Sequence, residues 1–592
     1  MKNNIQYISK NIALSLLAIG LVCFVSCSDF LDEKPYSSIT DQDVPDSDKG
    51  ADIWVMGAYS GLSKMFTWNE FPRVIELDND YFSGPTYAFG EVGAGNFQGN
   101  EQANSLWNRV YELIDKTNVS ISHIEQMQNV EARKKQNNLG EMYFLQAYGY
   151  FLLVRAYGEI PIYEKSINEG ENVHQPRQPI PVVYDHIIQL LSDAKDLMYK
   201  NTDTNFEEGR ACAGAAASLL AKVYATIGSA STPAGETVTV RAGKPFVLNS
   251  DGSRTFTFPT AQVINKIVVP GYESFSSQEY YQKALDIADE VINKKLYGNH
   301  ELVNYDILWK KAGKNSKEHF FALQTKSGDE YYGAAFVVPY CGRWSGNINT
   351  GYLLDGNGLT WGMRDHWYKL FENKDYRIEK GVIHRWVRQW SLEWNSGNYY
   401  PDTEEWKIKA TGKDNDGNVV GTPVSPFNDG RVYATDGSGE YSLAYLNKFA
   451  DVTDITITRM DAIFPLLRYA DVVLIYAEAS NELNGPNSDA LKALNDVRTR
   501  SNATAKTLAD FTTKADFRSA VIEERAMELA GEADRRWDLI RWGIYVGAMN
   551  SVGGVDECNV SKVREQKHIF YPLPQDEVLT NNAITENNPG WN

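Results

Sequence analysis

The pattern of apolar and polar positions predicts helices that come in pairs along much of the chain. Apolar residues recur every three or four positions, as on one face of a helix, in eight blocks. These blocks are 49–65 and 103–127, 132–157 and 182–198, 211–226 and 280–295, and 466–483 and 488–500. Small residues such as Ala213, Ala217 and Ala221 would let neighbouring helices approach closely. Two helices, a turn and two more helices are typical of a tetratricopeptide-like repeat.

Three long segments between these helices have a different pattern. Residues 66–102, 227–276 and 331–458 are rich in Gly, Asn, Asp, Thr and aromatic residues. Short alternating runs at 237–241 and 255–258 predict hairpins. Because ordinary connections have about four to six residues, insertions this long are usually functional loops or small subdomains. We therefore expect a predominantly α-helical scaffold whose loop-rich, partly β insertions carry the ligand.

The N-terminal residues predict export followed by lipid attachment. Two lysines and an apolar run at 12–25 precede Ser26 and Cys27, as in a signal peptide. A plain secretory signal would end in an A-x-A-like site, whereas FVSC at 24–27 resembles a bacterial lipobox, in which the cysteine is acylated and becomes the mature N-terminus. We expect Cys27 to anchor the protein to a membrane. The alternative is a soluble exported protein in which Cys27 is incidental.

Charge and cysteine content argue against nucleic acid and zinc as partners. The 592 residues include 58 Lys or Arg and 77 Asp or Glu, and a net charge of -19 would repel a phosphate backbone. Cys23 and Cys27 belong to the N-terminal segment, which leaves Cys212, Cys341 and Cys558 for the folded body. Three widely separated cysteines indicate neither a disulfide framework nor a zinc site.

Motifs of the common catalytic classes are absent from the sequence. It contains no HExxH, GxSxG, Walker GK[ST] or CxxC. Acidic pairs such as Asp78 with Asp80, or Glu404 with Glu405, could serve a glycosidase, which needs one carboxyl as acid and another as nucleophile or base. With 77 acidic residues such pairs arise freely, so we expect no enzyme and keep a surface glycosidase as an alternative.

Several stretches spread along the chain resemble one family. They are CSDFLDEKP at 27–35, GEMYFLQAYGYFLLVRAYGEIPIY at 140–163, PLLRYADVVLIYAEA at 465–479, EERAMELAGEADRRWDLIRWG at 523–543, YPLPQ at 571–575 and NNPGW at 587–591. In this order they resemble the SusD/RagB-like outer-membrane nutrient-binding lipoproteins of Bacteroidetes. Physically we interpret most of these blocks as scaffold. Arg536 and Arg541 can pair or stack on tryptophans, and Arg468 and Asp471 suit a tightly held Arg–Asp contact.

The resemblance implies a non-catalytic glycan-binding lipoprotein, lipid-anchored in the outer membrane and facing the cell exterior. Such a protein would form a lid on a TonB-dependent SusC-like transporter and deliver oligosaccharide or polysaccharide to it. The rivals are a RagB-like peptide-binding lid, the glycosidase above and a purely structural adaptor. The expected division is a signal peptide at 1–26, a lipidated tether at 27–45, a helical region at 46–330 with a ligand loop at 66–102, a variable ligand-binding region at 331–458 and a C-terminal helical region at 459–592.

Candidate ligand-binding residues follow from sugar chemistry. Sugars present flat CH faces and hydroxyl edges, so aromatic rings and a few Asp, Asn or Arg side chains would hold them. The candidates in the early loop are Asp78, Asp80, Tyr81, Phe82, Tyr87, Phe89 and Phe97. The resemblance implies a second set after the second helical pair, namely Tyr340, Arg343, Trp344, Asn347 and Trp361, with Trp367 as a further candidate.

Other aromatic and acidic residues have simpler interpretations. Trp107 follows a helical pattern and is assigned to the core. Trp386, Trp390 and Trp394 recur every four residues, which fits a helical or hairpin stripe that packs inward at least as well as a ligand platform. The resemblance implies calcium in some family members, and Asp-Asn-Asp at 78–80 supplies oxygen ligands. The EF-hand spacing is missing, however, so we expect no metal and no cofactor.

Overall fold

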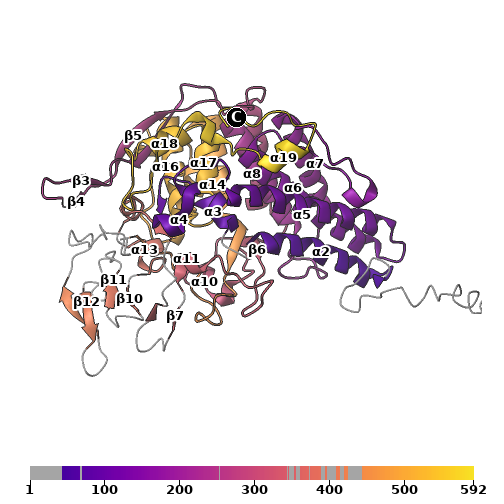
Figure 1. Cartoon of the computed structure of the whole chain (residues 1–592), viewed down its shortest axis with the longest axis horizontal. Coiled ribbons are helices and arrows are strands. Elements are labelled where there is room, and N and C mark those ends of the chain that lie inside the picture. Colours follow the sequence, from indigo (N-terminus) through magenta and orange to yellow (C-terminus); the bar gives the residue numbers. More distant parts are fainter. Residues whose placement is uncertain are drawn as a thin grey trace, which may run out of the picture.

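The computed structural model describes residues 43–66, 70–252, 254–342, 361–372, 374–383 and 443–591, and six short strands between 344 and 423. The structure is 49% helix and 9% strand, which confirms the predominantly α-helical class. In Figure 1 the early helices occupy one end of the molecule, the C-terminal helices lie at its centre, and the β3–β4 hairpin projects at the other end.

The first part of the chain forms a row of helices whose bounds follow the predicted blocks closely. Block 132–157 coincides with α6, which begins where the Glu131 side chain accepts N–H groups and ends at Gly158 with φ of 72°. The helices are α2 (Asp48–Phe66), α3 (Glu70–Glu76), α4 (Thr86–Gly93), α5 (Glu101–Gln126), α6 (Ala132–Tyr157), α7 (Ile180–Leu197), α8 (Ala213–Ala230) and α9 (Ser277–Ile292).

Consecutive helices of this row pack against one another, from α5 to α9. Small residues make the contacts close: a Cβ on Gly149 of α6 would lie 3.2 Å from Val110 of α5. Nearly every residue of the Ala-rich α8 is buried, which places this helix inside the row. The predicted pairing of helices is therefore observed, and small side chains allow it.

The C-terminal region adds a second group of helices and corrects one predicted boundary. Block 466–483 begins as a strand, because β14 (Phe464–Arg468) pairs antiparallel with β6 (His319–Leu323) before α14 starts. A short apolar run does not distinguish a buried strand from a helix start. The helices are α14 (Tyr469–Asn484), α15 (Ser488–Arg500), α16 (Lys514–Glu528), α17 (Arg535–Arg541), α18 (Tyr545–Asn550) and α19 (Gln575–Thr580).

Small sheets and single turns of helix fill the long insertions. The run at 237–241 is β2 (Thr237–Ala242), paired with β5 (Thr260–Asn265), and β3 (Phe246–Leu248) pairs with β4 (Arg254–Phe256), so the second predicted run ends two residues early. The remaining elements are α10 (Tyr305–Leu308), α11 (Val338–Cys341), α12 (Asp365–Tyr368), α13 (Tyr376–Glu379), β1 (Phe82–Ser83), β7 (Trp344–Ser345), β8 (Leu353–Leu354), β9 (Gly362–Met363), β10 (Arg385–Arg388), β11 (Trp394–Ser396), β12 (Ile408–Lys413), β13 (Val419–Pro423) and the 3-10 turns Ile167–Glu169, Lys311–Gly313, Leu508–Asp510 and Gln566–Ile569.

Two predictions about tryptophans can be followed in these elements. Trp107 is 3% exposed and belongs to the core, as predicted. Trp386 and Trp394 lie on the paired strands β10 and β11, where Trp386 is opposite Asn395 and Trp394 is opposite Val387, so the two do not share one face of this pair. Trp390 lies outside the described residues, and the inward packing of the three stays a prediction.

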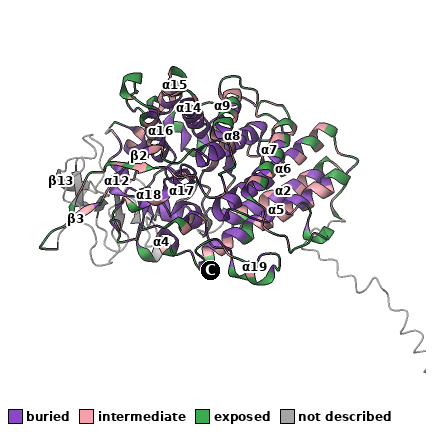
Figure 2. Cartoon of the chain, turned by 90° about the horizontal axis from the view of Figure 1, so that it is seen from above, coloured by how far each residue is buried: buried purple, intermediate pink, exposed green. Residues whose placement is uncertain are grey.

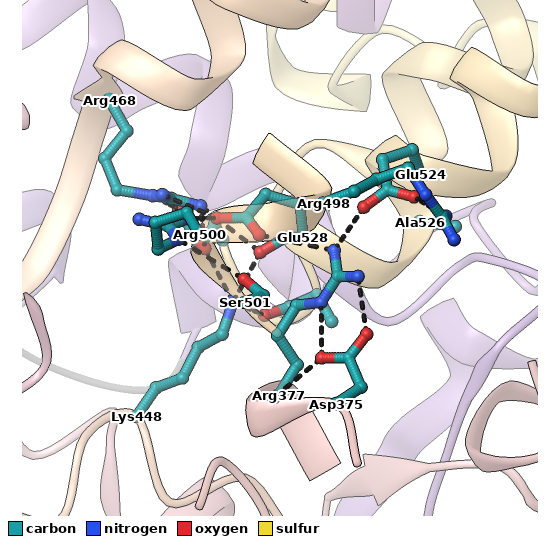
Figure 3. A network of polar contacts seen from close by, with 12 residues as sticks. Asp375, Arg377, Lys448, Arg468, Arg498, Arg500, Ser501, Glu524, Ala526 and Glu528 are labelled. Carbon is teal, nitrogen blue, oxygen red and sulfur yellow. Dashed lines mark hydrogen bonds and ion pairs between the residues drawn. The ribbon is translucent and has the colours of Figure 1, made fainter. Parts of the chain in front are cut away.

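A buried network of arginines and carboxylates joins the insertion at 331–458 to the C-terminal helices (Figure 3). Arg377 of α13 contacts Glu524 of α16 at 2.6 Å and Asp375 at 2.7 Å. Glu528 contacts Arg468 at 2.9 Å and also pairs with Arg500. Burial alone would raise the pKa of Glu528, but the surrounding arginines lower it well below its usual value. The network therefore attaches α13 firmly to α15 and α16.

The buried residues form one continuous core that runs through both groups of helices (Figure 2). Exposed residues concentrate on the outer helix faces and in the connections. Within the described part of the chain, no helix combines the length and apolar character that a membrane crossing requires. Residues 1–42, with the predicted signal peptide and Cys27, lie outside the described residues.

Candidate functional site

The two segments predicted to bind ligand meet in the structure, and they meet inside the protein. β1 pairs antiparallel with β9, which brings the early loop against residues 361–368. The ring centroids of Phe82 and Tyr340 are 5.6 Å apart, and those of Tyr340 and Trp361 are 5.3 Å apart. Arg73 of α3 lies over the Trp361 ring at 5.6 Å. Phe82, Tyr340 and Trp361, which come from the two predicted sets, thus form one aromatic cluster.

The burial of the candidate rings corrects the predicted ligand platform. None of the described candidate rings is more than 3% exposed. A ring that is covered on all sides cannot stack on a sugar in this conformation, so these side chains are part of the core. The residues concerned are Tyr81, Phe82, Phe89, Phe97, Tyr340, Trp361 and Trp367.

Asp78 is the centre of a buried ion-pair group rather than a ligand contact. Its two carboxylate oxygens contact Arg564 at 2.8 Å and Arg536 at 2.6 Å, and the hydroxyl of Tyr545 donates to it. Burial would raise the pKa of Asp78, but the two guanidinium groups lower it below its usual value. A glycosidase acid needs a raised pKa, so Asp78 does not suit that role.

Asp80 is held in the same way by Arg535, the residue before Arg536. Nε and Nη2 of Arg535 donate to its two oxygens at 2.8 and 2.7 Å. With both carboxylates of 78–80 engaged by arginines, these residues do not fit a calcium site. Among the described residues, no group of three or more His, Cys, Asp or Glu could hold a metal ion. The two aspartates fasten the early loop to α17, which is a structural role in this conformation.

The other predicted residues keep their status as predictions. Tyr87 lies in α4 and Trp344 in β7, where Trp344 is paired with Leu354, and their side chains are not among those described. Arg343 and Asn347 lie outside the described residues, as do Glu404 and Glu405.

Two adjacent tyrosines that were not singled out from the sequence are exposed at the start of the insertion. Tyr331 is 68% and Tyr332 45% exposed. Oδ1 of Asp329 accepts their backbone N–H groups at 2.9 and 3.1 Å, and Gly333 N–H closes the turn on the Asp329 carbonyl at 2.9 Å. The turn therefore presents both rings from a fixed backbone. The signal in the sequence was an aromatic pair that follows Gly-Asp-Glu at 328–330.

Two family profiles match the chain at its two ends. The one described as "SusD family" matches residues 347–591, and the one described as "Starch-binding associating with outer membrane" matches residues 29–225. The chain belongs to the SusD/RagB family. The family resemblance drawn from the sequence motifs is thereby confirmed.

Full-length relatives agree with this membership. SusD-like protein P2 of Formosa agariphila is 23% identical over 96% of this chain and 98% of its own length. Among solved structures, surface glycan-binding protein A from Bacteroides fluxus matches with a TM-score of 0.61 at 18% identity over 91% of this chain and 98% of its own. A laminarin binding SusD-like protein matches with a TM-score of 0.60 at 19% identity over 91% of this chain and 98% of its own. The fold is that of SusD-like proteins.

The blocks that carry the SusD/RagB motifs are scaffold in this structure. Arg541 lies over the Trp542 ring at 4.0 Å and contacts Glu478 at 2.6 Å, and Arg536 lies over Trp537 at 5.3 Å. The predicted pairing and stacking of these two arginines is therefore confirmed.

The Arg–Asp contact predicted near 468–471 has other partners than expected. Asp471 pairs with Arg525 at 2.6 Å, while Arg468 pairs with Glu318 and with Glu532 at 2.7 Å. Each of these charges is buried, so a structural role accounts for both residues.

Proposed function

We propose that this protein is a non-catalytic, cell-surface glycan-binding lipoprotein that captures oligosaccharide or polysaccharide and delivers it to a TonB-dependent SusC-like transporter. The observation that carries the proposal is the match of residues 29–225 to a family described as starch-binding and associating with the outer membrane. Two proteins of the same fold, one named a surface glycan-binding protein and one a laminarin binding protein, support the glycan class. Cys27, as the lipidated residue, would hold the protein at the outer membrane.

The proposed ligand region is the insertion at 331–458. Its exposed Tyr331 and Tyr332 can supply aromatic faces to a sugar. Trp344 is predicted to extend this ligand surface, together with Arg343 and Asn347, which lie close to it in the sequence. The anchoring of α13 by Arg377 would keep this region in place while a long glycan is bound. The early loop contributes indirectly: its strand β1 pairs with β9 of the insertion, and the ion pair of Asp80 with Arg535 holds the loop in place.

Affinity electrophoresis and isothermal titration against a panel of polysaccharides test the glycan class. The protein would start at Ser28, and the panel would include laminarin, starch and xylan, with mixed peptides as the competing class. At least one polysaccharide should retard the protein. Binding of peptides and of none of the glycans would overturn the proposal in favour of a peptide-binding lid.

A pair of variants tests the region. Tyr332→Ala should weaken glycan binding by about 1 to 3 kcal/mol if the ring is an anchor, because aromatic anchors dominate such contacts. Trp54→Ala is the matched control, since Trp54 of α2 is a partly exposed ring stacked on His123 and lies outside the insertion. Equal losses in both variants would contradict the assignment of the region.

The anchor and the transporter need separate experiments. Cys27→Ala should move the protein from the membrane fraction to the soluble exported fraction, and an unchanged distribution would contradict lipidation at Cys27. Crosslinking in intact cells should connect the protein to an outer-membrane β-barrel transporter. If the protein binds glycan in vitro but no such crosslink forms, the proposed glycan capture is supported and the proposed delivery to a transporter is contradicted.

A further inference from the structure

A polar cavity of about 400 Å³ lies at one end of the helical row, apart from the insertion at 331–458. Its walls are the N-terminal turn of α2, the first three turns of α6 and the segment that joins α7 to α8. All of its lining residues precede residue 212. The volume falls at the lower end of the range of about 300 to 1,000 Å³ that small-molecule sites occupy.

The floor of the cavity is a prearranged set of hydrogen-bonding groups around Glu141. Nε of Arg210 donates to both Glu141 oxygens at 3.1 and 3.0 Å. The hydroxyl of Tyr59 and Nδ2 of Asn137 donate to the same carboxylate, each at 2.7 Å. The Glu141 side chain is 1% exposed, so these contacts hold it rigidly. Rigid polar groups at the base of a cavity favour a specific ligand orientation.

Asn138 supplies an unused donor beside this floor. Nη2 of Arg210 donates to its Oδ1 at 3.1 Å, which fixes which end of the amide is the oxygen. Asn138 is fully buried and lines the cavity, and within the described residues its Nδ2 has no hydrogen-bond partner. Because buried donors are nearly always paired in folded proteins, an oxygen of a bound molecule is the expected partner.

The charge of the lining restricts the class of ligand. Four carboxylates, those of Asp48, Glu131, Glu141 and Glu207, face two cations, Lys134 and Arg210. Both cations are also engaged by Asp52, at 2.6 Å from Lys134 and 3.1 Å from Arg210. The excess of negative charge would repel phosphates and carboxylates and would attract a cation.

The half-buried ring of Phe206 and the ring of Tyr199 complete the walls. Arg133 stacks on the Tyr199 ring at 4.5 Å, which fixes its orientation. Two rings beside placed donors and acceptors suit a molecule with apolar CH faces and hydroxyl edges.

We propose that this cavity is a second binding site for a single sugar unit, one that is neutral or carries an amine, and that it rejects acidic sugars. The choice of sugars over other hydroxyl-rich molecules rests on the proposed glycan function. Hydroxyls of the sugar would accept from Asn138 and donate to Glu207, while Glu141 keeps Arg210 in place. An amine would gain further from the carboxylates at the opening, where Asp48, Glu131 and Glu207 are exposed.

Three probes with the same ring and different charges test the proposal. Glucosamine, glucose and glucuronate are titrated at pH 6.5 with the protein starting at Ser28, and binding is followed by saturation-transfer NMR. Glucosamine should bind about three times more tightly than glucose, as a surface-exposed charge pair would give, and glucuronate should not bind. Equal binding of the three probes, or binding of none, would overturn the proposal. Binding of lysine but of neither glucosamine nor glucose would overturn the sugar class.

Matched variants locate the binding. Thr204→Trp would fill the cavity from an exposed lining position, whereas Thr202→Trp places the same side chain at an exposed position of the same segment outside the lining. Thr204→Trp should abolish binding of both sugars and Thr202→Trp should not. Glu207→Gln should reduce the preference for glucosamine, and Glu208→Gln, which lies next to it and outside the lining, should leave it unchanged. Identical behaviour within either pair would contradict the site.

Polysaccharide binding separates this proposal from the proposed function. Thr204→Trp should still be retarded in affinity electrophoresis, because the cavity is separate from the insertion. Sugar binding in the cavity together with no polysaccharide binding would retain the cavity and reject the proposed function. If the protein binds polysaccharide and Thr204→Trp does not change the binding of any monosaccharide, the cavity site is rejected and the proposed function is retained.

Discussion

Between α5 and α8 the buried contacts are made mainly by apolar and small side chains, whereas between β14 and α18 arginines and carboxylates fill much of the interior. Gly149 of α6 lies against Val110 of α5, and the buried residues of α8 are all small or aliphatic: Ala, Leu, Val and Ile with some Gly, Ser and Thr. In the second region Arg468, Arg525 and Arg536 are each at most 2% exposed and paired with carboxylates. Apolar packing depends on volume, whereas a buried ion pair depends on both partners, so the two regions should respond differently to substitution.

Asp78→Asn should have the largest effect, because Arg536 and Arg564 would lose their buried counter-charge. Removal of one partner of a buried pair costs about 3 to 5 kcal/mol, so the free energy of unfolding should fall by about this amount. Urea denaturation followed by circular dichroism measures it. Lys283→Ala breaks the exposed pair with Glu279 on α9 and should cost only about 0.3 to 0.5 kcal/mol. Equal costs would show that burial does not distinguish the two pairs.

Glu76 should make stability fall between mildly acidic and mildly alkaline pH. Burial raises the pKa of this 1%-exposed carboxyl to about 8, and nearby Asp534 adds to the shift. Between its unfolded pKa near 4.5 and its folded pKa near 8, the folded state binds the proton and the unfolded state does not, so the stability from this group is fully present below about pH 4.5, falls as the pH rises, and is lost once the pH has passed about 8. The loss from this group should be on the order of 5 kcal/mol.

Denaturation profiles between about pH 4 and pH 9 test whether Glu76 causes this loss of stability. Glu76→Gln keeps the shape of the side chain without an ionisable proton, so it should remove this part of the loss between about pH 4.5 and pH 8. Glu101→Gln, at an exposed position of the first turn of α5, is the control and should follow the parent protein. A loss of the same size over this pH range in Glu76→Gln would assign the effect to other groups.

Gly149→Ala should give the smallest change and tests the apolar region. A Cβ there would lie 3.2 Å from Val110 and 3.3 Å from Ile114, so overpacking of about 1 to 3 kcal/mol should exceed the helix-propensity gain of about 1 kcal/mol. Gly57→Ala in α2 meets nothing within 4 Å and should instead stabilise the protein by about 0.5 to 1 kcal/mol. Thermal unfolding of both variants measures the difference. Stabilisation by both would show that α5 and α6 have room to separate.

The same contrast explains what could be predicted from the sequence. Helices such as 132–157 and 488–500 were predicted with the observed bounds, because apolar periodicity records which face is buried. The role of Asp78 and Asp80 was not, because an Asp-Asn-Asp run beside aromatic residues is the same string in a binding loop and in an arginine-lined interior. Their partners Arg535, Arg536 and Arg564 are more than 450 positions away, and local spacing carries no record of them.

The remoteness of those partners has a consequence for the newly made chain. Until residues 535–564 have been synthesised, Asp78 and Asp80 have no counter-charge, and a carboxylate without one resists burial. The aromatic cluster beneath them therefore cannot close early, and contacts of such long sequence separation slow folding. The chain should remain open and extendable while most of its length is made, which would suit the export across a membrane that the proposed function requires.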